Sequence, residues 1–258
     1  MHRPIGIFDS GLGGSSVWRE IATLLPHEHT LYLADSANAP YGERPPEDIL
    51  RLSIKNTEFL VERGCKIIVV ACNTATTNAI AHLRANYPLP FIGIEPAIKP
   101  AALETRNKKV GVLATKGTLA SSLFHSTSKL YAAGITILEQ EGTGLVELIE
   151  AGKAQGREVR VLLEGYLQPM LDRGMDCLVL GCTHYPYLLP VLRELLPPGF
   201  KIMDSGEAVA RQTKAVLQGM DLLRPEGRAF HSFYINRDPR VLQGLVNGPG
   251  VEVSQLDF

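Results

Sequence analysis

The sequence predicts an α/β fold made of two pseudo-symmetric α/β domains, with mainly parallel sheets, that face each other across a cleft. Three observations predict it. Short apolar, β-branched segments alternate with longer helical patterns. One strand-containing segment recurs 110 residues later (182 − 72 = 110). The chain has 258 residues, 45% of them hydrophobic, which is enough to form one large core or two smaller ones.

Eight segments have the length and apolar content of buried strands. They are Pro4–Phe8, Thr30–Ala34, Lys66–Ala71, Phe91–Ile94, Lys109–Ala114, Ile135–Leu138, Cys177–Gly181 and Phe200–Met203. Short apolar runs bounded by turn residues are typical of strands that are covered on both faces in a parallel sheet.

Helical patterns separate these strands. Apolar residues recur at helical spacing in three stretches, Val17–Leu25, Ile49–Leu60 and Val159–Leu167. Pro46, followed by two acidic residues, is a helix-start signal, and Gly64 is a stop signal. Two further helical runs, Thr76–Ala85 and Tyr187–Leu196, follow the third and seventh predicted strands.

The repeat divides the chain. RGCKIIVVACNT (Arg63–Thr74) aligns without gaps on RGMDCLVLGCTH (Arg173–His184). Two apolar strands can match by chance, but the Arg-Gly before the strand and the Cys after it match as well. We therefore predict a first domain of residues 1–97 plus 207–258 and a second domain of residues 98–206. The segment 207–258 has no counterpart in the repeat and is expected to pack on the first half.

The composition excludes several classes of partner. Lys and Arg number 26 against 27 Asp and Glu, and no basic run is longer than Lys108-Lys109. Nucleic-acid binding and a polybasic membrane anchor are therefore not expected. The apolar stretches are too short for a membrane span, and the N-terminal sequence lacks a signal-peptide pattern. We expect a cytoplasmic protein whose four cysteines are thiols rather than disulfides.

Two of the cysteines occupy equivalent positions at predicted strand ends. Cys72 and Cys182 each lie between a strand and a helical run. Ligands of α/β sheets bind at this edge, and a helix N-terminus is expected to lower the thiol pKa from roughly 8.5 toward neutrality. Removing an α-proton from one face and returning a proton to the other requires two such groups, and each contributes roughly 10²–10⁴-fold. The pair therefore indicates acid–base chemistry at a carbon centre.

The four cysteines have other interpretations as well. Cys65 and Cys177 lie before or inside strands, so we interpret them as buried structural cysteines. A zinc site at Cys182 and His184 is disfavoured, because structural zinc needs four ligands and the cysteine pairs lack the usual spacing. A redox dithiol would require Cys72 and Cys182 within disulfide reach. A non-catalytic amino-acid-binding module stays open as an alternative.

Five segments strengthen the interpretation that Cys72 and Cys182 act as an acid–base pair. They are FDSGLGG (Phe8–Gly14), DSANAPYG (Asp35–Gly42), ACNTAT (Ala71–Thr76), GIEP (Gly93–Pro96) and LGCTHYP (Leu180–Pro186). In sequence, order and spacing they resemble the signature segments of bacterial glutamate racemases. That resemblance implies a cofactor-independent enzyme that interconverts L- and D-glutamate and supplies D-glutamate for peptidoglycan synthesis.

The resemblance also implies roles for individual residues. Cys72 and Cys182 are the catalytic acid/base pair, with Asp9 assisting Cys72 and His184 assisting Cys182. Glu150 is a further carboxylate near the site. The implied substrate-binding residues are Asp9, Ser10, Tyr41, Gly42, Asn73, Thr74, Thr183 and His184.

Some of these residues also have purely structural interpretations. Asp9, Asn73, Thr74 and Thr183 fit helix caps and strand-to-helix turns, and Tyr41-Gly42 reads as a surface loop. Aspartate stays open as an alternative substrate. A homodimer is expected as the commonest assembly. Some relatives have an N-terminal extension linked to activation by a cell-wall precursor, and this regulation is not expected here.

Overall fold

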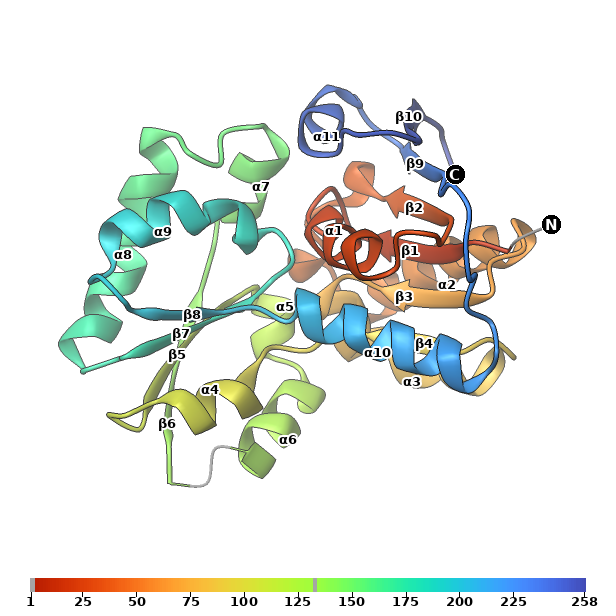
Figure 1. Ribbon diagram of the computed structural model, residues 1–258. Helices are drawn as coiled ribbons and strands as arrows, with labels where there is room; N and C mark the ends of the chain where they lie inside the picture. The colour runs from red at the N-terminus through yellow and green to blue at the C-terminus, as the bar shows by residue number, and fades with distance from the viewer. Residues whose placement is uncertain (1–2, 132–133) are drawn as a thin grey trace.

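The computed structural model describes residues 3–131 and 134–258 and contains two parallel sheets, one in each half of the molecule (Figure 1). The first sheet has the strand order β10-β9-β2-β1-β3-β4 and the second has the order β6-β5-β7-β8. The strands of the first are β1 (Ile5–Asp9), β2 (Thr30–Ala34), β3 (Ile67–Val70), β4 (Phe91–Gly93), β9 (His231–Ile235) and β10 (Val251–Gln255). Those of the second are β5 (Lys109–Ala114), β6 (Thr136–Glu141), β7 (Cys177–Gly181) and β8 (Lys201–Met203).

Helices cover both sheets. On the first-sheet side they are α1 (Ser15–Leu24), α2 (Pro46–Glu62), α3 (Asn73–Asn86), α10 (Gly206–Gly219), α11 (Arg240–Leu245) and the 3-10 turns η1 (Ser36–Asn38) and η2 (Tyr41–Glu43). On the second-sheet side they are α4 (Ile98–Glu104), α5 (Lys116–Leu119), α6 (Ser122–Tyr131), α7 (Leu145–Glu150), α8 (Arg157–Asp172), α9 (Leu189–Leu195) and the 3-10 turn η3 (Tyr185–Leu188). Within the described ranges, no helix is both long enough and apolar enough to cross a bilayer.

The predicted α/β class and its internal repeat are confirmed. All eight predicted strands are present, and the order β2-β1-β3-β4 in the first sheet matches β6-β5-β7-β8 in the second. The register also matches, because Gly6 pairs with Ile68 in one half and Gly111 pairs with Leu178 in the other.

The repeated Arg-Gly has a structural cause. Gly64 and Gly174 follow α2 and α8 with φ of +73° and +85°. A residue with a side chain is strained in this left-handed region, so glycine ends both helices in the same way. The next strand then starts at an equivalent place in each half.

The C-terminal segment extends the first sheet. β9 pairs with β2, β10 pairs with β9, and α10 packs against α1. Neither strand was among the eight predicted. Buried and half-buried positions alternate along His231–Ile235, so this strand lacks the continuous apolar run of the central strands. The domain boundaries near residues 97 and 206 stay a prediction.

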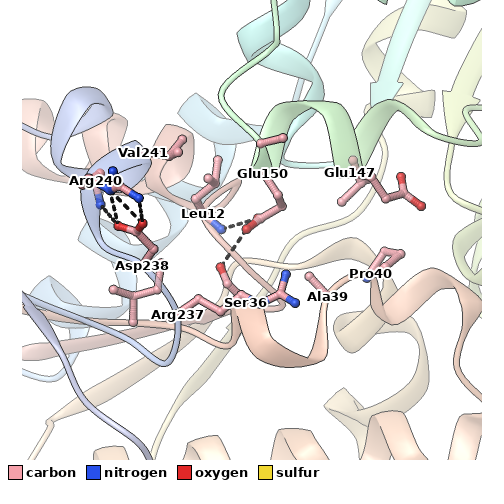
Figure 2. Close-up of a pocket in the computed structure, with 13 residues that line it drawn as sticks. Leu12, Ser36, Ala39, Pro40, Glu147, Glu150, Arg237, Asp238, Arg240 and Val241 are labelled. Atoms are coloured by element: carbon pink, nitrogen blue, oxygen red, sulfur yellow. Dashed lines mark hydrogen bonds and ion pairs between the residues drawn. The ribbon is translucent and has the colours of Figure 1, made fainter.

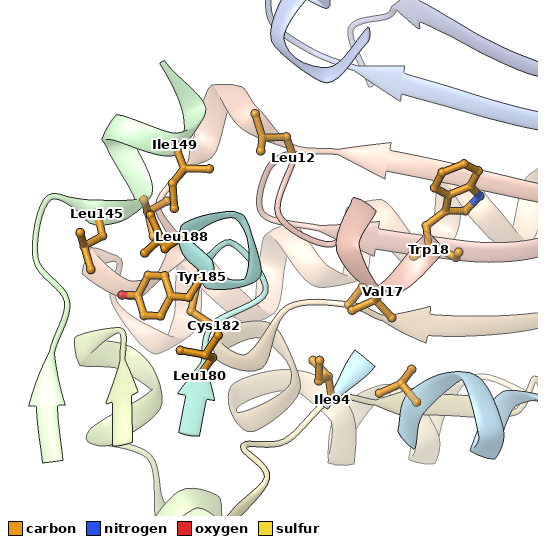
Figure 3. Packing of buried hydrophobic residues seen from close by; sticks show 14 of the residues in the cluster. Leu12, Val17, Trp18, Ile94, Leu145, Ile149, Leu180, Cys182, Tyr185 and Leu188 are labelled. Atoms are coloured by element: carbon orange, nitrogen blue, oxygen red, sulfur yellow. The ribbon is translucent and has the colours of Figure 1, made fainter. Parts of the chain in front are cut away.

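The apolar core fills both faces of both sheets. One cluster packs the central strands of the first sheet against α2 and α3, and another packs the second sheet against α4 and α6. The largest cluster continues from one half into the other (Figure 3). In Figure 3, Leu12 of the first half lies to the upper right of Ile149 and Leu188 of the second, and Cys182 belongs to the same cluster. The two halves are therefore packed together beside the predicted site.

Candidate active site

A small, narrow cavity lies between the two halves, and both strand-end cysteines line it. Its free volume is about 10 Å³, which is room for about one water molecule. Its lining residues are Ser10, Pro40, Tyr41, Gly42, Cys72, Asn73, Thr74, Thr115, Thr118, Val146, Gly181, Cys182, Thr183 and His184. We call it the catalytic cavity. It contains every predicted site residue except Asp9 and Glu150, both of which contact its wall.

A larger, open cavity of about 720 Å³ lies next to it (Figure 2). Pro40 and Val146 line both cavities and so separate them. This larger cavity is lined by charged side chains such as Glu147 and Arg240, but neither Cys72 nor Cys182 lines it. The predicted chemistry therefore belongs to the smaller cavity, which must open before a substrate can enter.

Cys72 lies where the sequence predicts, between β3 and the first turn of α3. It is the N-cap residue, and its Sγ accepts a hydrogen bond from the Ala75 amide at 3.4 Å. Its thiol donates to Ser10 Oγ at 3.6 Å. Burial, and secondarily the negative charge of Asp9, raise the pKa of Cys72 well above its usual value. The expected lowering at the helix N-terminus is therefore wrong for Cys72, because removal from water outweighs the amide hydrogen bond.

Cys182 directly follows β7, and the predicted helical run Tyr187–Leu196 begins as a 3-10 turn rather than as a regular helix. The Tyr185 amide donates to the Cys182 carbonyl at 3.1 Å, and η3 precedes the short helix α9. Pro190 lacks the amide proton that a helix continuous from Tyr185 would need at that position, so the regular helix begins only at Leu189, with Pro190 in its first turn. In place of a helix N-terminus, the His184 ring lies beside this thiol, with Nδ1 3.7 Å from Cys182 Sγ.

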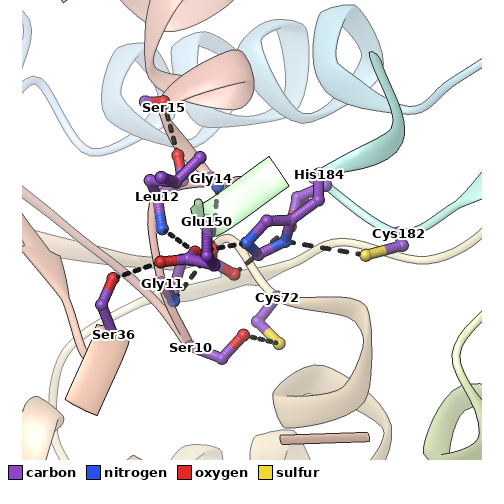
Figure 4. Close-up of polar contacts among 12 residues, drawn as sticks. Ser10, Gly11, Leu12, Gly14, Ser15, Ser36, Cys72, Glu150, Cys182 and His184 are labelled. Carbon is purple, nitrogen blue, oxygen red and sulfur yellow. Dashed lines mark hydrogen bonds and ion pairs between the residues drawn. The ribbon is translucent and has the colours of Figure 1, made fainter. Parts of the chain in front are cut away.

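His184 is held by Glu150, which reaches in from the end of α7 (Figure 4). His184 Nε2 lies 2.6 Å from Glu150 Oε1. The same carboxylate accepts from the Leu12 amide and from Ser36 Oγ, both at 2.7 Å. Burial alone would lower the pKa of His184, but its hydrogen bonds to Cys182 and Glu150 raise that pKa well above the usual value. The pKa of Glu150 is lowered: burial opposes ionisation, but the hydrogen bond and charge of His184 outweigh it. The pair is an imidazolium–carboxylate pair next to Cys182.

The glycines after Asp9 allow this close approach. A Cβ atom at Gly11 would collide with the Glu150 carboxylate, and one at Gly13 would collide with the His184 ring. The GLGG segment is thus required for contact between the two halves.

Asp9 organises the turn but makes no hydrogen bond to Cys72. Its Oδ2 accepts from the amides of Gly11 at 3.2 Å and Gly14 at 2.9 Å, and its Oδ1 accepts from Thr183 Oγ1 at 3.2 Å. Burial raises the pKa of Asp9 to about 6, although His184 and the two amides favour the charged form. Ser10, rather than Asp9, touches the Cys72 thiol.

Replacing Asp9 by asparagine is expected to change the pH dependence of stability. The folded chain holds a proton on Asp9 between about pH 4 and 6, where the unfolded chain has lost it. The free energy of unfolding therefore falls as pH rises through this window, by roughly 3 kcal/mol in total. Denaturant unfolding at pH 4 and pH 7 tests this. Asparagine does not titrate, so the free energy of unfolding of Asp9→Asn should lack this decrease. Relative to wild type, the variant should therefore be more stable at pH 7 than at pH 4 by about that amount. An unchanged difference between the two proteins would contradict it.

Hydroxyl groups from both halves line part of the catalytic cavity. Thr74 Oγ1 lies 2.9 Å from Thr115 Oγ1 and 3.3 Å from Thr118 Oγ1. Asn73 Oδ1 is buried and has no hydrogen-bond partner among the residues that the structure describes. The sequence prediction missed Thr115 and Thr118. Thr115 directly follows β5 and Thr118 lies in the next helix, α5, so the strand-end argument that found the cysteines would have found Thr115 too.

Tyr41 and Gly42 lie in η2 rather than in an open surface loop. Tyr41 is buried, and its hydroxyl donates to Asp35 Oδ2 at 2.5 Å. Asp35 and Ser36 were not predicted as site residues, although both belong to the DSANAPYG segment. Gly42 packs against Thr115. The turn η2 of the first half therefore contacts the second half at the edge of the cavity.

The described residues contain no group of three or more His, Cys, Asp or Glu side chains placed to hold a metal ion. All four cysteines are free thiols, as expected.

Two α/β halves that each contribute a thiol to one narrow cavity form a site suited to proton transfer on both faces of a small molecule. The chain belongs to the Asp/Glu/Hydantoin racemase family, whose family model matches residues 5–213. It is 50% identical to a glutamate racemase of Stutzerimonas stutzeri over 238 residues, covering 92% of this chain and 90% of that protein.

Solved structures agree over nearly the whole chain. A glutamate racemase from Bacillus anthracis has a TM-score of 0.88 at 30% identity and covers 99% of this chain and 98% of its own. The Escherichia coli glutamate racemase in complex with L-glutamate and the activator UDP-MurNAc-Ala has a TM-score of 0.87 at 35% identity, covering 98% and 97%.

Proposed function

We propose that this racemase interconverts L- and D-glutamate with Cys72 and Cys182 as its two bases. The observation that carries the proposal is the narrow cavity to which each half of the molecule contributes one thiol. The glutamate racemases to which the chain is similar support the choice of substrate.

The proposed reaction balances without any external reactant. One cysteine, as thiolate, takes the α-proton, and the other, as thiol, delivers its proton to the opposite face of the same carbon. The two sulfurs have then exchanged protonation states, so the reverse reaction uses the same groups in swapped roles. In the resting enzyme the raised pKa of Cys72 favours its thiol form, and the charged His184 ring lies 3.7 Å from Cys182 Sγ.

The cavity wall offers groups that match an amino acid with a second carboxylate. Asn73 Oδ1, for which the structure describes no partner, can accept from the α-ammonium group. The hydroxyls of Thr74, Thr115 and Thr118 can donate to a carboxylate. The charged His184 also lines this cavity. Donors from both halves of the molecule favour a dicarboxylate over an apolar amino acid.

The test is solvent deuterium incorporation at the substrate α-carbon, with L-glutamate and L-aspartate run in parallel. Proton NMR reports exchange, and circular dichroism reports inversion. We expect both with glutamate and far slower turnover of aspartate. Turnover of aspartate alone would reassign the substrate, and exchange with neither would leave a binding module.

We further propose that the protein works in the cytoplasm as a homodimer and supplies D-glutamate for peptidoglycan. The dimer is proposed because a homodimer with two-fold symmetry is the commonest assembly of soluble proteins. Light scattering should give twice the chain mass of 28.2 kDa. A monomer mass throughout the assay concentration range would contradict the dimer.

A further inference from the structure

We propose that Asn236, in the C-terminal segment outside the repeat, is a positioning residue for the loop that closes the catalytic cavity. That loop runs from Asp35 to Glu43 and is called here the closing loop. The inference deepens the proposed racemase function and rests on it for its kinetic readout. It assigns a role in the reaction to a segment that contributes no residue to the cavity itself.

Strand register places Asn236 next to the start of the closing loop. β2 and β9 are parallel neighbours in which Ala34 pairs with Ile235, the last residue of each strand. Asp35 and Asn236 are the next residues of these two strands, and the Asn236 amide continues the ladder to the Ala34 carbonyl at 3.4 Å. The carboxyl end of the added strand therefore meets the loop where it leaves the sheet.

Both ends of the Asn236 side-chain amide bind this loop. Its Nδ2 donates to Asp35 Oδ1 at 2.5 Å, and its Oδ1 accepts from the Ala37 amide at 2.8 Å. A side chain that satisfies a donor and an acceptor two residues apart fixes the backbone between them. An aspartate or a leucine at position 236 could not make both contacts.

The residues that Asn236 holds lead directly to the cavity wall. Asp35 is fully buried, and its other oxygen accepts from the Tyr41 hydroxyl at 2.5 Å. Ser36, between the two contact points, donates to Glu150 at 2.7 Å, and Glu150 holds His184. Loosening the loop therefore affects the Tyr41 wall and the Glu150 support together, without touching either cysteine.

The expected kinetic signature is a change in KM. Without the two hydrogen bonds of the Asn236 side chain, the closing loop samples displaced conformations. The substrate then binds only to the fraction of molecules in which the loop is ordered. The apparent dissociation constant is the intrinsic one divided by the fraction of molecules with an ordered loop, whereas the saturated enzyme keeps most of its rate. We expect Asn236→Leu to raise KM for glutamate about 10-fold and to change kcat by less than about threefold.

The aspartate variant gives a second signature. Asn236→Asp keeps the acceptor for Ala37 but sets a carboxylate against that of Asp35, which also faces Lys55 at 3.7 Å and the Asn38 amide. Like charges at this distance raise the pKa of one of the pair. The KM defect of Asn236→Asp, relative to wild type, should therefore be larger at pH 8.5 than at pH 6.5, whereas that of Asn236→Leu should not vary.

Asn247 supplies the matched control. It lies in the same segment, is exposed and makes no side-chain hydrogen bond among the described residues. Asn247→Leu and Asn247→Asp should leave KM unchanged. Hydrogen exchange of a peptide spanning residues 35–43 should be faster in Asn236→Leu than in wild type and Asn247→Leu, with β2 still protected.

Two results would overturn the inference. One is a KM within twofold of wild type in both Asn236 variants. The other is a loss of activity that follows the folded fraction alone, with unchanged exchange in the closing loop. If wild type itself fails to racemise glutamate, the proposed function fails, and the exchange comparison still decides whether Asn236 holds the loop.

Discussion

Cys72→Ser and Cys182→Ser are each expected to lower racemisation of glutamate by roughly 10³-fold, within the range that one general acid–base group contributes. Both sulfurs line the same cavity, and serine is too weak an acid to replace a thiol as proton donor or base. Each variant keeps one base. It should therefore still exchange the α-proton of one enantiomer with solvent, and the two variants should prefer opposite enantiomers.

The chain supplies its own controls for this experiment. Cys65 and Cys177 are also buried free thiols, but neither lines the catalytic cavity. Their serine variants introduce a buried hydroxyl, which costs stability, yet they should keep near wild-type activity per folded molecule. Deuterium exchange of L- and D-glutamate, followed separately by proton NMR, is the measurement. Near wild-type racemisation by both Cys72→Ser and Cys182→Ser would refute the two-base mechanism.

The parts of the fold that the sequence predicted are those with a local or repeated signal. The central strands are buried on both faces, so their apolar runs stand out, and the repeat identifies equivalent positions such as Gly64 and Gly174. Strand β9 alternates buried and half-buried residues at the side of the sheet, and its pairing with β2 spans about 200 residues of sequence. No local pattern reports such a pairing.

The site shows the same division. Cys72 and Cys182 could be found from strand ends alone, whereas the contact of Glu150 with Leu12 and Ser36 joins the two halves. The lowered thiol pKa was expected from local geometry and is wrong for Cys72, because the pKa depends on burial between the halves and on the charge of Asp9. The strand-end positions in the sequence predict which side chains reach the site. The pKa of each side chain depends on its surroundings in the folded protein.

The second large effect is expected at His184 and its carboxylate partner. His184→Gln removes the charge beside Cys182 and should lower kcat/KM about 10²-fold. Glu150→Gln keeps an oxygen for the Leu12 amide but removes the anion that supports the imidazolium. Hydrogen bonds to charged groups contribute roughly 1.5–3 kcal/mol, so a loss of about 10- to 100-fold follows.

The pH profile separates a supporting carboxylate from a merely structural one. Glu150 is one of the groups that raise the pKa of His184, so the imidazolium of Glu150→Gln should lose its proton at lower pH. The basic limb of the kcat/KM profile should therefore move to lower pH in this variant. Glu147→Gln is the control: Glu147 lies one turn earlier on α7, is exposed, and makes no hydrogen bond to His184. Glu150→Gln could instead lower activity while the basic limb of its profile lies at the same pH as that of Glu147→Gln. The Glu150 carboxylate would then only hold the two halves together, and groups other than Glu150 would raise the pKa of His184.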